Sequence, residues 1–129
     1  MPATDAVNKQ VCDYKAGLGN VVKVHEQDRD TVHAASGAGA AAPIATTPAS
    51  AATTWGASAM GSGADAGYAV AVGSKCGYSL PPNKTARSYS VWNAAGTTYL
   101  WAATLDSSLT SNAEAVPIDV TPRTRHKEQ

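Results

Sequence analysis

The chain has 129 residues and no net charge, because ten Lys and Arg balance ten Asp and Glu. Leu, Ile, Val and Phe together supply 18 residues, or 14%, whereas Ala alone supplies 26. This apolar content is below that of a well-packed globular domain, but zero net charge argues against a disordered chain. It also argues against nucleic acid as the principal partner, because phosphate binding needs a concentrated basic surface. We expect one small domain that gains stability by packing against neighbouring chains.

The first zone, residues 1–33, begins with a predicted helix. Apolar residues recur every three or four positions from Thr4 to about Leu18, which places them on one helical face. Thr4 or Asp5 can cap the start, and Gly17 and Gly19 should end the helix. The face consists of Val7, Val11, Tyr14 and Leu18.

A β-branched run follows the helix. Residues 20–25 read NVVKVH, and alternation predicts a strand with Val22 and Val24 on one face and Lys23 and His25 on the other.

The second zone, residues 34–67, is rich in Ala, Gly, Ser and Thr and has no period. Pro43 and Pro48 interrupt regular hydrogen bonding, so the segment is predicted to be an extended arm. Its large apolar residues are Ile44, Trp55 and Met60, which are the predicted partner-binding anchors. A flexible linker is the alternative interpretation.

The third zone, residues 68–120, contains short runs with strand character separated by Gly, Pro, Asn and Ser. Strands are expected at residues 67–72, 76–80, 86–92, 97–105 and 115–120. This spacing is typical of sandwiches and barrels. The predicted fold class is therefore mainly β, a small antiparallel sandwich or barrel with a short N-terminal helix and an extended Ala/Gly-rich arm.

The clearest predicted element is a hairpin closed by residues 93–96, NAAG. Asn at the start and Gly at the end suit a type I turn with a left-handed glycine. Tyr89 and Val91 should share a direction on the first strand. On the second strand, alternation places one set of side chains on one face as the main aromatic cluster. That set is Tyr99, Trp101, Ala103 and Leu105.

The last zone, residues 121–129, carries the one basic cluster of the sequence. This cluster is Arg123, Arg125, His126 and Lys127, and Glu128 follows it. It is too short for a nucleic-acid arm, and a solvated or docking tail is expected.

Enzyme chemistry is not expected. The stretch from His25 to His33 contains two imidazoles and three carboxylates, but it lacks the HExxH and calcium-loop spacings. Cys12 with His25 or His33 and Asp28 is a conceivable nucleophilic set. However, Cys12 lies on the predicted helix beside Val11, which favours a packed structural cysteine. We therefore predict no catalytic, cofactor-binding or metal-binding residues.

The remaining sequence features indicate the cellular compartment in which the chain is made. Cys12 and Cys76 lie 64 positions apart and form no metal-type spacing, so two reduced thiols are favoured over a disulfide. No apolar run resembles a targeting or membrane-spanning segment. We expect synthesis in a host cytoplasm and no membrane partner.

The hairpin region, SVWNAAGTTYLWAATL, together with the arm, resembles the β-structural accessory proteins of tailed-phage virions, such as head decoration, cement or fibre proteins. The resemblance implies a virion protein that binds a capsid lattice and copies of itself, often as a symmetric homo-oligomer. A carbohydrate-binding β module is the alternative, because Trp55, Trp92 and Trp101 could stack on sugars. Since the chain has no Phe and few Leu or Ile, we expect most of its aromatic residues to fill the core instead.

Overall fold

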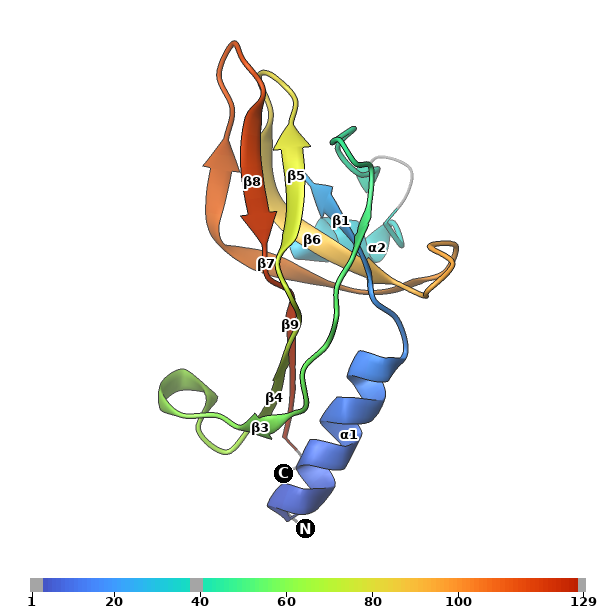
Figure 1. Ribbon diagram of the computed structural model, residues 1–129, viewed down its shortest axis with the longest axis vertical. Coiled ribbons are helices and arrows are strands. Elements are labelled where there is room, and N and C mark those ends of the chain that lie inside the picture. Colours follow the sequence, from blue (N-terminus) through green and yellow to red (C-terminus); the bar gives the residue numbers. More distant parts are fainter. Residues whose placement is uncertain (1–3, 38–40, 128–129) are drawn as a thin grey trace.

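The computed structural model describes residues 4–37 and 41–127, and it is mainly β with antiparallel sheets. The described residues include an α-helix near the N-terminal end, and their strands form no closed barrel. Figure 1 shows a sandwich of strands at one end of the molecule and a smaller helix-and-sheet unit at the other. The predicted fold class is confirmed in its sandwich form.

The sandwich consists of a four-stranded sheet and a two-stranded sheet. The first has the order β2-β1-β6-β7 and the second pairs β5 with β8. Their bounds are β1 Val21–His25, β2 Ala51–Ala52, β5 Cys76–Leu80, β6 Thr85–Trp92, β7 Tyr99–Thr110 and β8 Val116–Val120. Between the two sheets lies the main core, which contains Val22, Val24, Ile44, Cys76, Tyr78, Leu80, Ala86, Tyr89, Val91, Ile118 and Val120. Removing these apolar side chains from water is the main stabilising term.

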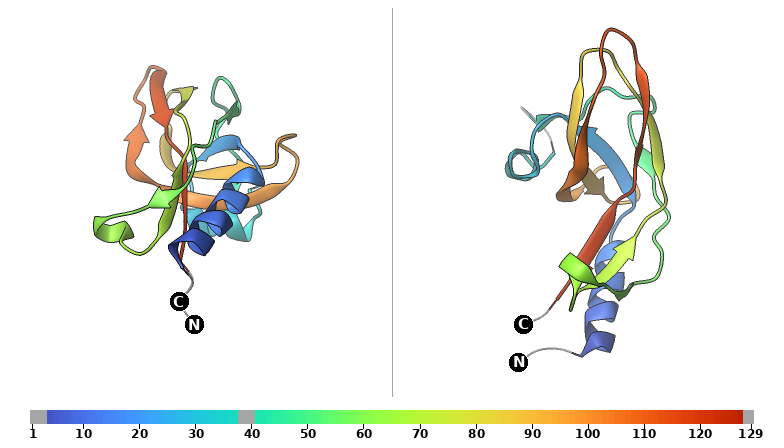
Figure 2. Two further views of the ribbon diagram at one scale, coloured as in Figure 1. Left: turned by 60° about the horizontal axis from the view of Figure 1, so that its bottom comes forward. Right: turned by 90° about the vertical axis from the view of Figure 1, so that its left-hand side faces the viewer.

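The smaller unit packs helix α1 (Asp5–Gly17) on a sheet of order β3-β4-β9. The strands are β3 Ala59–Met60, β4 Ala69–Val72 and β9 Arg123–His126. Both views in Figure 2 show α1 beside β4 and β9. The buried residues between them are Cys12, Ala16, Ala69 and Ala71. These small side chains let the helix approach the sheet closely.

One long antiparallel ribbon joins the two units. On one side β4 continues through residues 73–75 into β5, and on the other β8 continues through residues 121–122 into β9. At the junction, the Gly73 N–H donates to the Pro122 carbonyl at 2.8 Å. The two strands of the ribbon therefore stay hydrogen-bonded at Gly73 and Pro122, where they pass from the β5–β8 sheet into the sheet that contains β4 and β9.

The predicted helix is confirmed, with Thr4 as its cap: the Thr4 hydroxyl accepts from the Val7 N–H at 3.3 Å. The predicted strand at residues 20–25 is also confirmed as β1, with Val22 and Val24 in the core. Helix α2 (Arg29–Ala34) follows β1 and packs against β6 and β7. His25, expected on the other face of β1, is also buried, and its ring contacts Ala41 and Ser90.

The hairpin between β6 and β7 is confirmed, including the type I turn. The Gly96 N–H donates to the Asn93 carbonyl at 2.8 Å, and Gly96 has a left-handed φ of +72°. The prediction that Tyr99 shares a face with Trp101 is wrong. Val91 opposes Trp101 whereas Trp92 opposes Tyr99, so Leu100 is an extra residue that reverses the alternation. Tyr99 instead contacts Trp92 and His33.

The basic C-terminal segment, expected to be a solvated or docking tail, is a strand from Arg123 to His126. Arg123 pairs with Val72 and His126 pairs with Ala69 across the β4–β9 ladder. Thr124 is buried under α1, where its carbonyl accepts from the Cys12 thiol. The charged composition of this segment indicates a polar tail, whereas the structure shows a strand in which Thr124 faces inward.

The expected arm is extended over much of its length, and it lies along its own domain. The Ile44 N–H donates to the Val24 carbonyl at 2.8 Å, and the Thr53 N–H donates to the Asn20 carbonyl at 2.8 Å. β2, β3 and a 3-10 turn, η2 (Gly63–Asp65), are its short regular pieces. The arm therefore completes the edges of both units.

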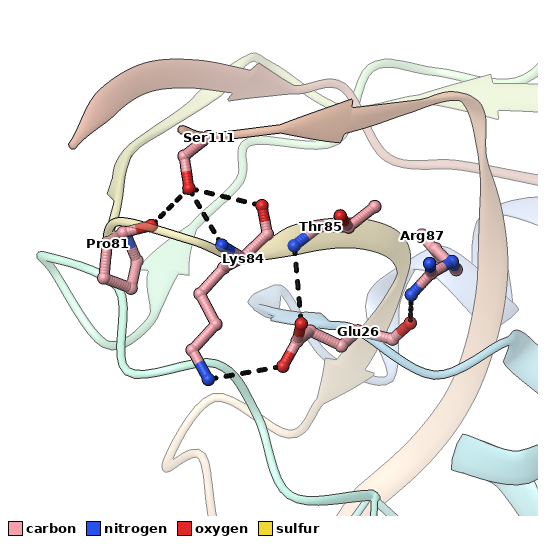
Figure 3. Close-up of polar contacts among 6 residues, drawn as sticks. All are labelled: Glu26, Pro81, Lys84, Thr85, Arg87 and Ser111. Atoms are coloured by element: carbon pink, nitrogen blue, oxygen red, sulfur yellow. Dashed lines mark hydrogen bonds and ion pairs between the residues drawn. The ribbon is translucent and has the colours of Figure 1, made fainter. Parts of the chain in front are cut away.

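At the end of the sandwich away from α1, side chains form hydrogen bonds between neighbouring turns (Figure 3). Glu26 accepts from the Thr85 N–H at 3.4 Å and from Lys84 Nζ at 3.5 Å. The buried Ser111 hydroxyl contacts the Pro81 carbonyl and accepts from the Lys84 N–H at 3.0 Å. Ser111 thus connects the β5–β6 turn to the end of β7.

Replacing Ser111→Ala should lower the free energy of unfolding by about 1–3 kcal/mol, because it leaves the partly buried N–H of Lys84 and carbonyl of Pro81 without their partner. Urea denaturation of both proteins measures the change. Ser107→Ala is the matched control, since Ser107 is an exposed residue of β7, the strand that ends just before Ser111. Equal losses in the two variants would contradict the role given to Ser111.

Candidate docking surface

The exposed face of α1 carries the apolar stripe that the sequence revealed. Val7, Tyr14 and Leu18 have 42%, 70% and 45% of their surface exposed. The face that packs on the sheet is instead Asn8, Cys12 and Ala16. A helix normally turns its apolar stripe toward its own core, so this stripe is an apolar surface left uncovered by the described residues.

A cleft of about 1000 Å³ lies next to this stripe, between α1 and β9 on one side and β7 on the other. Lys15 of α1 and Leu18, the residue directly after the helix, line it, and Leu100 and Trp101 of β7 line the opposite wall. Leu100 also lies against Gly19, directly after Leu18. The stripe and the cleft therefore form one continuous surface, which we call the docking surface: Val7, Val11, Tyr14, Leu18, Leu100 and Trp101.

Charged residues that line the cleft form ion pairs and hydrogen bonds with one another. Asp65 forms ion pairs with both Arg123 and Arg125, and the Lys15 ammonium donates to the Arg125 carbonyl at 2.9 Å. Partial desolvation raises the pKa of Asp65, but the hydrogen bonds and charges of the two arginines outweigh it and the pKa is lowered. The cleft is lined by Lys15, Arg29, Arg123 and Arg125 and by Asp65, Asp106 and Asp119. These charges nearly cancel.

Aromatic contacts shape the wall of the cleft. Trp101 lies 6.0 Å from Tyr89 and 6.2 Å from Trp55 between ring centroids. The Tyr89 hydroxyl accepts from the Arg123 N–H at 3.0 Å and contacts the Arg123 carbonyl at 3.3 Å. The indole N–H of Trp101 is buried and has no acceptor among the described residues. This donor is buried within the wall and stays unused in the described part of the chain.

The three predicted partner-binding residues lie in different places. Ile44 is 6% exposed and belongs to the main core. Trp55 and Met60 are half-buried and pack against the smaller core. The indole N–H of Trp55 donates to the Gly19 carbonyl at 2.9 Å. All three contact their own domain, and their role toward a partner stays a prediction.

The groups considered for chemistry are separated by the fold. The Cys12 thiol donates to the Thr124 carbonyl in the smaller core, whereas both ring nitrogens of His25 are bonded in the sandwich, to Ala41 and Ser90. His33 contacts the Tyr99 hydroxyl on the surface. The structure confirms Cys12 and Cys76 as buried free thiols. Burial raises the pKa of the Cys12 thiol, which favours its unreactive form.

Across residues 4–37 and 41–127, no group of three or more His, Cys, Asp or Glu residues is arranged to hold a metal ion. The helices in that part of the chain include none with the length and apolar character needed to cross a membrane. Comparison with known proteins gives no match to a family model, to a curated protein or to a solved structure. The docking surface is therefore the feature of the molecule that bears most directly on function.

Proposed function

We propose that this chain is a non-enzymatic assembly protein that binds neighbouring protein chains, as a decoration or cement component of a phage capsid does. The observation that carries the proposal is the apolar stripe of α1. Tyr14 exposes 70% of its surface beside Val7 and Leu18, and a grouped apolar patch is typical of a protein–protein interface. A helix of this kind binds through residues spaced three or four apart.

The distribution of apolar residues supports the same proposal. The chain has few large aliphatic side chains, yet three large apolar residues of α1 and its C-terminal cap face outward while Ala and Cys fill the space beneath the helix. Keeping these groups in water costs stability unless a partner covers them. Binding of that partner would then stabilise the fold by mass action.

The finer proposal, a virion location, is supported by the small β sandwich and the long Ala-rich segment, the features on which the sequence resemblance is based. Cosedimentation with empty tailed-phage capsids stripped of their decoration proteins would test it. Failure to bind any such capsid would count against the virion but not against assembly in general.

The carbohydrate-binding alternative receives less support. Trp92 is 8% exposed and bonded to Ser90, and Trp55 is bonded to Gly19. Trp101 is half-buried and contacts the rings of both Tyr89 and Trp55. Stacking on a sugar ring needs an exposed aromatic face.

The assembly proposal predicts a native mass above that of one chain. Light scattering over a concentration series should show an oligomer, and Tyr14→Asp should reduce its affinity at least tenfold, because a charge would be buried in the interface. Ala113→Asp adds the same charge at an exposed turn and should leave the mass unchanged. A folded monomer at every concentration would contradict the proposal.

A further inference from the structure

Strand β7 has an open edge. It is the last strand in the sheet order β2-β1-β6-β7. Within the described part of the chain, its backbone forms hydrogen bonds only with β6. No residue of β7 is fully buried, although the strand has 12 residues and includes Leu100, Trp101 and Leu105. A long apolar edge strand is a template for pairing with another chain.

The ladder shows which backbone groups of β7 are unpaired. The Val24 carbonyl points away from β6, toward Ile44, so the backbone of Val24 does not bond to its neighbour Tyr89. The backbone of Tyr89 therefore bonds on its other side to Ala103. Because directions alternate along a strand, the N–H and C=O groups of Ala102 and Thr104 point outward from the edge of the sheet.

The central stretch of this edge, residues 101–104, lacks the usual protection, although a register shift bounds it on each side. Natural edge strands discourage pairing with lysines, prolines or inward-pointing charges. Residues 99–105, YLWAATL, contain no charge and no proline. The first charged residue is Asp106, which lies in the irregular stretch of β7 between Thr104 and Leu109.

We propose that two copies of this chain pair through β7, antiparallel and centred on Ala103, to form one continuous sheet across a two-fold axis. The inference rests on the proposed function, of which it names one partner. In this register Ala102 and Thr104 exchange backbone hydrogen bonds with Thr104 and Ala102 of the second copy. Ala103 lies opposite Ala103 of the second copy on the axis.

The side chains fit a second copy in this register. Trp101 opposes Leu105 of the second copy, twice by symmetry, and an aromatic side chain opposite an aliphatic one is a favourable cross-strand pair. Asp106 lies three positions from the axis, beyond the regular stretch, so the like charges of the two copies do not meet at the axis. A centre at Ala102 or Thr104 would instead place Trp101 opposite Ala103 or Ser107. The zero net charge of the chain adds no long-range repulsion between copies.

A disulfide at the axis tests the register. Ala103 directs its backbone toward β6, so it forms a non-hydrogen-bonded pair with its symmetry mate, with Cα atoms about 4.5 Å apart. That separation is within the range of a disulfide. Under mild oxidation the Ala103→Cys variant should become a covalent dimer on a non-reducing gel. Ala102→Cys, the matched control, lies opposite Thr104 of the second copy and should stay mainly monomeric. The native thiols are both buried.

A second variant blocks the edge without touching the inner ladder. Thr104→Pro removes an N–H that points outward, and proline is tolerated on the free side of an edge strand. In the Ala103→Cys background it should abolish the covalent dimer while circular dichroism stays unchanged. If the native chain is an oligomer but Ala103→Cys gives no more cross-linking than Ala102→Cys, β7 pairing is overturned and the proposed function stands. A chain that is always monomeric would overturn both.

Discussion

Replacing Gly73→Ala is expected to lower the free energy of unfolding by about 3 kcal/mol, one of the two largest effects anticipated for this chain. A Cβ atom at this position would collide with the hydroxyl of Thr53 and would lie 2.9 Å from Cγ of Pro122. Both neighbours are buried, so neither can move away easily. The substitution therefore strains the junction at which the ribbon passes from the sandwich to the smaller unit.

Chemical denaturation followed by tryptophan fluorescence measures this loss. Gly77→Ala is the matched control in the same ribbon, because its Cβ atom would meet only Asp119 Oδ1, at an ordinary 3.5 Å. That variant should change the stability by less than about 1 kcal/mol. Similar losses at the two glycines would contradict the steric explanation.

The second large effect is expected at His25, whose side chain is fully buried. Its Nδ1 contacts the Ala41 carbonyl at 2.6 Å, and because a carbonyl only accepts, Nδ1 carries the proton. Nε2 then accepts from the Ser90 hydroxyl at 2.7 Å, and that hydroxyl accepts from the Trp92 N–H. Protonation of Nε2 would leave this chain of bonds without its acceptor.

His25→Ala should therefore lower the free energy of unfolding by about 3 kcal/mol, through a cavity and unpaired buried groups. The pH dependence gives a sharper test. Burial is the main cause that lowers the pKa of His25, the Lys23 charge adds to it, and the Ala41 bond only partly opposes it. The unfolded chain consequently binds a proton more readily, near pH 6.5.

The sign of the effect follows from this difference. The stability that His25 contributes is fully present above pH 6.5 and is lost as the pH falls from 6.5 toward the folded-state pKa. Asp65 and Asp28 have lowered pKa values and act only below about pH 4. Denaturation midpoints measured from pH 7.5 to 5 should therefore fall for the native chain, less so for His25→Gln. A curve unchanged by His25→Gln but flattened by His33→Gln would refute this assignment.

The elements predicted correctly from sequence are those with strong local signals. Helix α1 has a cap at Thr4 and glycines at its end, and β5 lies between turn residues with bounds identical to those predicted. The hairpin turn was predicted from Asn93 and Gly96. In each case the determining contacts lie within a few residues, so local propensity and final structure agree.

The features that escaped prediction depend on distant contacts. The strand character of residues 123–126 is set by β4, more than 50 positions earlier, while local composition indicates a polar tail. The reversal at Tyr99 depends on one extra residue, Leu100, which alternation rules do not reveal. The apolar stripe of α1 is evident from the three- and four-residue spacing of its side chains, but this spacing does not determine which face of the helix packs on the sheet. Cys12, Ala16 and Asn8 decide that, because their small size permits close approach.

The strand pairing at the end of the chain also has a mechanical consequence. His126 pairs with Ala69 at the outer end of the β4–β9 ladder, and the ladder continues inward to Arg123 and Val72. A force applied through the C-terminal end would load these rungs one after another, as in unzipping, rather than all together, as in shear. Asp65, bound to Arg123 and Arg125, spans two of the rungs and links their rupture. A chain anchored in an assembly by its C-terminal end would therefore yield first at β9, while the sandwich behind Gly73 stays under little load.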